Sequence, residues 1–169
     1  MDGFSKMICK ALEDYDVEIQ KNYKVSGYFR PSKRWDLAVL KDDTIIALIE
    51  YKSQVGESTK KNFNNRIEEA IGNAHDFKMA ERRDLVSTCG KTWLGYLFVL
   101  ENTPEVMKSC ENHSSVFENY LNSFVKLEST LYNDVCLLLT ERETGFVSYG
   151  QEPLRKFLNS LEKHVKRNM

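Results

Sequence analysis

Three charged residues lie within an otherwise apolar stretch, WDLAVLKDDTIIALIEYK at residues 35–52. The apolar residues on either side of the central Lys-Asp-Asp predict two neighbouring buried strands joined by a short turn. Asp36 opens the first strand, whereas Glu50 and Lys52 close the second. A buried charge is costly unless it is paired, hydrogen-bonded or bound to a metal ion. A sheet built from this stretch therefore requires the three side chains to compensate one another.

Whether the three side chains can meet depends on the turn between the strands. Glu50 and Lys52 are two residues apart, so a strand directs both to the same face. A clean two-residue turn at 42–43 pairs Asp36 with Ile49 and sends Glu50 to the other face, whereas one extra residue places Asp36 opposite Glu50. Directly opposed carboxylates lie about 5 Å apart and repel unless a divalent cation joins them. We therefore predict an odd-length loop or a β-bulge in this hairpin.

The periodicity of the whole chain predicts an α/β fold with a mixed central sheet flanked by helices. Helices are expected at about 3–15, 64–82, 114–131 and 153–167, and strands at about 23–29, 35–41, 44–52, 91–101, 135–140 and 146–149. The strand–helix–strand unit from 44 to 101 predicts two parallel strands. Repeats and linker-like stretches are absent from the sequence, so residues 1–169 are expected to form a single nuclease-sized domain.

Composition narrows the classes of partner. The net charge is −1, so any binding to nucleic acid must come from a local basic patch. No apolar run approaches the roughly 20 residues of a membrane span, and no signal peptide opens the chain. The four cysteines form no C-x-x-C pair, which argues against a zinc site and fits a reducing cytoplasm.

The order of the charged residues and of the predicted elements is that of the common core of PD-(D/E)xK nucleases. The hairpin follows one helix and precedes another helix and a buried strand. Trp35 stands where these nucleases usually have proline before the aspartate. The match is weak by itself, because aspartate and lysine at strand ends are commonly just solvated.

Longer motifs are more specific. GYFRPSKRWDLAV, IEYKSQVG and NFNNRIEEAIGNAHDF closely resemble the XhoI-type family of type II restriction endonucleases, whose patterns are R-P-x-K-x-W-D, E-[FY]-K-S-Q and N-N-F-N-N-R-x-E-E-A-x-G. The resemblance extends over about residues 2–167 and includes LYNDVCLLLTERETG and Y-x-x-E-P. Two features depart from the family: ESTKK replaces a Gly/Ser/Phe-containing loop after Gly56, and relatives carry more chain ahead of the MDGF-like start. The chain is therefore expected to lack an N-terminal extension.

Phosphodiester hydrolysis explains the charged trio. Metal ions held by carboxylates can activate water and neutralise charge at phosphorus. Asp36 and Glu50 are the expected Mg²⁺ ligands, with the carbonyl of Tyr51 as a third. Lys52 is expected beside the scissile phosphate, where it stabilises developing negative charge.

Three further residues are candidates to support this site. Gln54 continues on the face of Glu50 and Lys52, where it holds a water or a phosphate oxygen or simply caps the strand. A further acid, either Glu13 on the first helix or Glu69 on the second, is expected to complete the metal shell.

Two segments are candidates for DNA contact. Residues 21–34 contain five basic residues and no acid, which suits phosphate binding as well as a solvated loop. KKNFNNR, at 60–66, offers asparagine and arginine side chains that can bond adenine and guanine. Asn65 and Glu68 also have the spacing of a helix cap with its capping box. The DNA-binding candidates are Arg30, Lys33, Arg34, Lys60, Lys61, Asn62, Asn64, Asn65 and Arg66.

The resemblance implies a Mg²⁺-dependent homodimer that cuts both strands of double-stranded DNA at a short palindrome, which for this family is CTCGAG. It also implies a cognate DNA methyltransferase that protects host sites. Two alternatives stay open. One is a structure-specific PD-(D/E)xK nuclease of DNA repair or mobile elements, and the other is a DNA-binding domain without catalysis.

Overall fold

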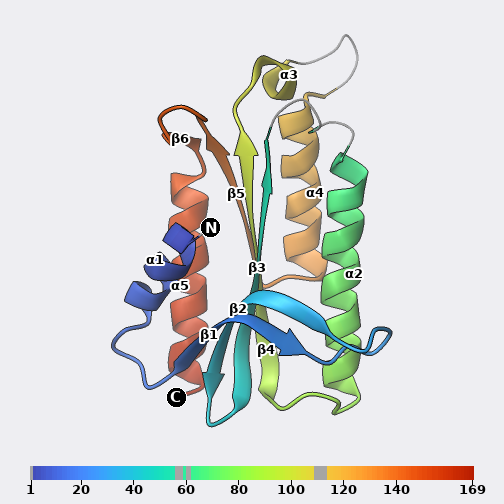
Figure 1. The fold of residues 1–169 in the computed structure, drawn as a ribbon, viewed down its shortest axis with the longest axis vertical. Coiled ribbons are helices and arrows are strands. Elements are labelled where there is room, and N and C mark those ends of the chain that lie inside the picture. Colours follow the sequence, from blue (N-terminus) through green and yellow to red (C-terminus); the bar gives the residue numbers. More distant parts are fainter. Residues whose placement is uncertain (1, 56–58, 60–61, 109–113) are drawn as a thin grey trace.

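A mixed six-stranded sheet forms the centre of the computed structural model, which describes residues 2–55, 59, 62–108 and 114–169 (Figure 1). The strands are β1 (Glu18–Val25), β2 (Lys33–Lys41), β3 (Thr44–Gln54), β4 (Thr88–Glu101), β5 (Asp134–Thr140) and β6 (Val147–Tyr149). The helices are α1 (Asp2–Ala11), α2 (Phe63–Arg82), α3 (Pro104–Met107), α4 (Val116–Thr130) and α5 (Gln151–Arg167). The strands lie side by side in chain order. β3, β4 and β5 are mutually parallel, and the other neighbours are antiparallel.

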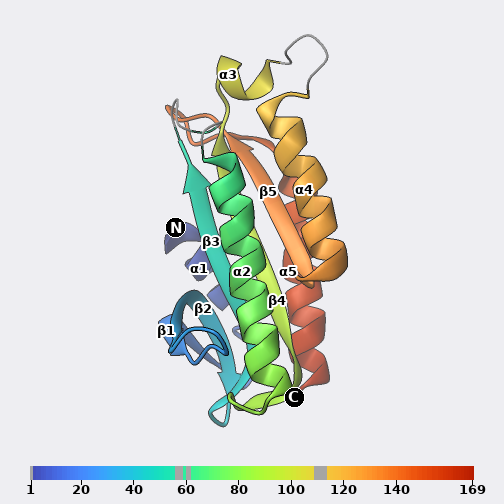
Figure 2. The same cartoon turned by 90° about the vertical axis from the view of Figure 1, so that its right-hand side faces the viewer.

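Helices cover both faces of this sheet. α1 and α5 lie on one face and α2 and α4 on the other, which is the side turned toward the viewer in Figure 2. Aromatic side chains of β4 and α4, including Tyr96, Phe98 and Phe124, fill the core under α2 and α4. Ile8 of α1 and Phe157 of α5 belong to the opposite core. The predicted α/β class, the mixed flanked sheet and the parallel β3–β4 pair are confirmed.

The first part of the chain differs most from the prediction. α1 ends at Ala11 instead of residue 15, and β1 occupies 18–25 instead of 23–29. The segment EIQKNYKV has no clean alternation of polar and apolar residues, because β1 is a partly exposed edge strand. α3, a single turn capped by Thr103, was not predicted.

The hairpin of β2 and β3 has a two-residue turn. Asp42 and Asp43 both adopt positive φ, at 47° and 61°, which matches the type I′ turn preferred between antiparallel strands. Short polar side chains tolerate this left-handed backbone better than most residues.

The predicted irregularity lies in the strand instead of in the turn. The register shifts between Val39 and Leu40, where Ile46 is the extra residue of β3, and beyond it Leu37 pairs with Ile49. A two-residue turn combined with this bulge gives the register that a three-residue loop would give. The prediction of a bulge in this hairpin is confirmed.

None of the helices among the described residues is long and apolar enough to cross a membrane.

Candidate active site

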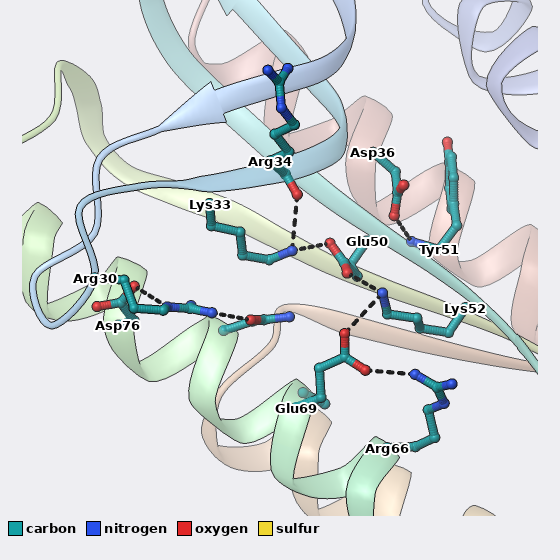
Figure 3. A network of polar contacts seen from close by, with 12 residues as sticks. Arg30, Lys33, Arg34, Asp36, Glu50, Tyr51, Lys52, Arg66, Glu69 and Asp76 are labelled. Atoms are coloured by element: carbon teal, nitrogen blue, oxygen red, sulfur yellow. Dashed lines mark hydrogen bonds and ion pairs between the residues drawn. The ribbon is translucent and has the colours of Figure 1, made fainter. Parts of the chain in front are cut away.

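β2 and β3 separate just beyond the Leu37–Ile49 pair, while β3 continues along β4 as far as Gln54. The register carried on by one residue brings Asp36 to the level of Glu50. The charged residues of the hairpin thus lie where one edge of β3 opens (Figure 3). A parallel strand on the far side fixes this part of β3, so the opening does not loosen it.

The carboxylate of Asp36 takes the place of a missing strand partner. Its Oδ2 accepts the N–H of Tyr51 at 2.7 Å. In an extended strand the N–H and C=O of one residue point to the same edge, so the Tyr51 carbonyl is also directed toward Asp36. This contact joins Asp36 to the residue that follows Glu50, and three oxygen-bearing groups meet at the opened edge.

Two ammonium groups hold the buried carboxylate of Glu50, whose side chain is 2% exposed. Lys33 Nζ lies 2.6 Å from Oε2, and Lys52 Nζ lies 2.7 Å from Oε1. Lys52 also lies 3.0 Å from Oε1 of Glu69 on α2. Burial lowers the pKa of Lys52, but the two carboxylates outweigh burial and raise that pKa above its usual value. Lys52 therefore stays protonated across the neutral range.

The first turns of α2 complete the group. Arg66 Nη1 lies 2.8 Å from Oε2 of Glu69, and Arg66 Nε donates to Oε1 of Gln54 at 3.4 Å. Partial burial raises the pKa of Glu69, but Lys52 and Arg66 outweigh it and lower that pKa below its usual value. Glu69, Gln54 and Arg66 thus join the predicted trio, and the structure connects all of them through Lys52.

The donor atoms at the opened edge suit a hard divalent cation. Two carboxylates and one carbonyl are oxygen ligands of the kind that Mg²⁺ takes. The Lys33 ammonium already lies on Glu50, which shows that this carboxylate attracts a cation. Within the described parts of the chain, no three His, Cys, Asp or Glu side chains gather as a metal cluster. A metal here would therefore rely on Asp36, Glu50 and the Tyr51 carbonyl.

The other predicted residues are spread more widely. Glu13 is exposed just after α1, on the opposite face of the sheet, and is not brought to the site. Arg34 is exposed and donates to the carbonyl of Asn22 at 3.4 Å. Its side chain points away from Glu50 in Figure 3.

The asparagine-rich segment begins α2. Asn62 is the N-cap, and its side chain makes no capping hydrogen bond. Asn65 lies inside the first turn, so its prediction as N-cap is wrong. Asn64 and Asn65 are exposed and accessible to a large ligand. Lys60 and Lys61 lie outside the described residues.

Asp76 on α2 is a structural residue that the sequence did not reveal. Its Oδ1 accepts the N–H groups of Tyr28 and Phe29, at 2.9 and 2.6 Å, and its Oδ2 accepts Arg30 Nε at 3.0 Å. Gly27 must stay glycine, because a Cβ there would lie 2.3 Å from Oδ2. Asp76 therefore fixes the loop that leads into Lys33.

Exchanging Asp76 for Asn should destabilise the protein in a pH-dependent way. Burial raises the pKa of Asp76, but the Phe29 N–H and Arg30 outweigh it and lower that pKa. The carboxylate therefore stabilises the fold above the unfolded pKa of about 3.9, and this contribution disappears as pH falls through the folded pKa. We expect a loss of about 1–3 kcal/mol at pH 7 that shrinks toward pH 3, measured by urea unfolding.

The exposed Asp14→Asn substitution is the matched control for this loss and should change little. An equal difference between Asp76→Asn and the unaltered protein at pH 7 and at pH 3 would contradict the role given to the charge of Asp76.

Comparisons with known proteins agree with this site. The chain is 33% identical to the type II restriction enzyme BstVI of Geobacillus stearothermophilus, over 98% of this chain and 86% of that protein. It is 34% identical to XhoI of Xanthomonas vasicola, over 95% and 67%, and 40% identical to AbrI of Azospirillum brasilense, over 62% and 50%. A solved structure of a protein of unknown function aligns over 96% of this chain and 92% of its own, at 15% identity and a TM-score of 0.33. The family description "Restriction endonuclease XhoI" matches residues 1–147, and the chain belongs to this restriction endonuclease family.

Proposed function

We propose that this chain is a type II restriction endonuclease that hydrolyses phosphodiester bonds of double-stranded DNA with the help of Mg²⁺. The observation that carries the proposal is the meeting of Asp36, Glu50 and Lys52 where β2 leaves β3. Membership of the XhoI family and relatives named type II restriction enzymes support it.

Each residue of the group has a role in this reaction. Asp36, Glu50 and the Tyr51 carbonyl hold Mg²⁺. The bound ion stabilises charge on the phosphate and favours ionisation of the attacking water. Lys52 exchanges a carboxylate partner for a phosphate oxygen and stabilises the developing charge. Water attacks phosphorus and the bond to the 3′ oxygen breaks, which leaves a 5′-phosphate.

Neighbouring side chains position these groups. Glu69 orients the Lys52 ammonium from α2, at 3.0 Å. Arg66 steadies both Glu69 and Gln54, so Gln54 is held toward the same face, where it can bond a phosphate oxygen. These contacts keep Lys52 in place without occupying the opened edge of β3.

DNA is expected to lie across the opened edge and the start of α2. Asn64 and Asn65 are exposed there, and a helix N-terminus favours phosphate. Arg34 and Lys33 offer positive charge at the start of β2. Arg30, which Asp76 and Asn73 hold, shapes the loop and contributes charge at its border. Lys60 and Lys61 would extend the same surface.

A short palindrome is most simply read by a two-fold dimer in which each subunit cuts one strand. We propose a homodimer, with CTCGAG as the first site to test. A restriction enzyme requires a cognate DNA methyltransferase that protects the host chromosome in the prokaryotic cytoplasm.

Digestion of a plasmid of known sequence in Mg²⁺ tests this function. We expect discrete fragments whose ends share one short palindrome and carry 5′-phosphates. An uncut linear duplex together with cleaved branched DNA would replace the proposal with a structure-specific nuclease. Bound but uncut DNA would leave a DNA-binding domain without catalysis.

A further inference from the structure

Lys33 occupies an unusual position for a DNA-contact residue. Its Nζ lies 2.6 Å from Oε2 of Glu50, donates to the carbonyl of Arg34 at 3.0 Å and lies 4.9 Å from the centre of the Trp35 ring. The side chain is 12% exposed. Lys33 is therefore bound inside the site, although it stands on the strand that approaches from the DNA side.

The group around Lys33 is electrically neutral. Its three positive side chains are Lys33, Lys52 and Arg66, and its three negative side chains are Asp36, Glu50 and Glu69. A divalent cation added to a neutral group gains little, whereas removal of one ammonium leaves a net negative site that favours a cation. Both oxygens of Glu50 also have an ammonium partner, so a metal ligand oxygen becomes available only when one lysine leaves.

Lys33 is the lysine that can leave. Lys52 keeps a second carboxylate, Glu69, and is held from α2. Lys33 has Glu50 as its one carboxylate among the printed ion pairs of the described residues, and its remaining hydrogen bond is to a backbone carbonyl. Rotation of its flexible stem moves the ammonium toward the start of β2 without any change of backbone.

We propose that Lys33 is an exchangeable internal cation that occupies Glu50 in the free protein and moves to a DNA phosphate when DNA binds. Phosphate is a strong partner for lysine and would compensate the lost contact. The departure of Lys33 releases Oε2 of Glu50 for the divalent ion. DNA and metal therefore bind cooperatively, and linkage requires each to strengthen the other by the same factor. The inference rests on the proposed nuclease function, because it concerns the metal site of that reaction.

Titration of Mn²⁺ into the DNA-free protein tests this inference by calorimetry. Lys33→Met keeps the stem that lies against Trp35 and removes the charge. We expect it to lower the Kd for Mn²⁺ by a factor of about 5–150, the usual range for coupled sites. Lys24→Met, an exposed lysine of the neighbouring strand β1, is the matched control and should leave the Kd unchanged. Equal affinities in Lys33→Met and the unaltered protein would overturn the inference.

A second measurement on the unaltered protein covers the case in which Lys33→Met does not fold. Acetylation rates of individual lysines, read by mass spectrometry, should show slow labelling of Lys33 relative to Lys24 and faster labelling of Lys33 in saturating Mn²⁺. A Lys33 rate that Mn²⁺ leaves unchanged would overturn the inference. Neither measurement involves cleavage. A protein that binds Mn²⁺ as expected but never cuts DNA would refute the nuclease function and leave the exchange of Lys33 standing.

Discussion

Exchanging Lys52 for Met is expected to slow DNA cleavage by about 10²–10³-fold or more while the fold stays intact, because the substitution removes one group that stabilises the transition state. After the exchange, Glu50 keeps Lys33 and Glu69 keeps Arg66, so neither carboxylate loses its last cationic partner. A single-turnover cleavage assay under saturating protein measures the loss, and circular dichroism melting checks the fold.

Glu50→Gln is the companion variant and should lose at least as much activity, because it removes a metal ligand and keeps the shape of the side chain. Lys163→Met, an exposed lysine on α5, controls for the general loss of positive charge and should cut normally. Cleavage at the unaltered rate in both Lys52→Met and Glu50→Gln would mean that the reaction occurs elsewhere.

Removal of divalent ions should abolish cleavage without unfolding the protein. The ion is asked to supply about 4 kcal/mol or more of transition-state stabilisation, which corresponds to about 10³-fold in rate. Folding should not need it, because Asp36 is bonded to the Tyr51 N–H and Glu50 is bonded to two ammonium groups. We therefore expect dialysis against a chelator to shift Tm by no more than about 2 °C, since metal-free and metal-bound folds differ only by the binding free energy.

Restoring Mg²⁺ should return the full rate, which separates metal loss from irreversible damage. Undiminished cleavage after exhaustive chelation would contradict the role of the ion. A collapse of Tm on chelation would instead contradict the assignment of the ion pairs as sufficient for folding.

The trio could be predicted from the sequence because local rules determine it. Apolar alternation defines the strands, and the requirement that Asp36 and Glu50 share one side of the sheet demanded an extra residue in the hairpin. The structure supplies it as the bulge at Ile46. The helix after β3 returns the chain to a parallel partner, so the β3–β4 pair also followed from the order of elements.

Contacts between distant segments could not be predicted in the same way. Lys33 and Glu50 are 17 residues apart, and Lys33 lies ahead of the apolar run that defined the predicted strand. Asp76 bonds a loop 46–48 residues away in which no pattern repeats. Neither segment carries a local signal for its partner.

The start of α2 shows why capping preferences alone were insufficient. Three asparagines in KKNFNNR all suit an N-cap, and spacing to Glu68 favoured Asn65. The helix starts earlier because Phe63 packs on Tyr120 of α4, with ring centroids 4.8 Å apart. Tertiary packing selected among positions that local preference left nearly equal.

Binding of Mn²⁺ by the protein on uncleaved duplex DNA tests the shared metal site of Asp36 and Glu50 most directly. We expect Asp36→Asn and Glu50→Gln each to remove the same equivalent of bound Mn²⁺, and the double variant to remove no more than either one. Mn²⁺ bound by the double variant with unchanged stoichiometry and affinity would contradict a metal held between these two carboxylates.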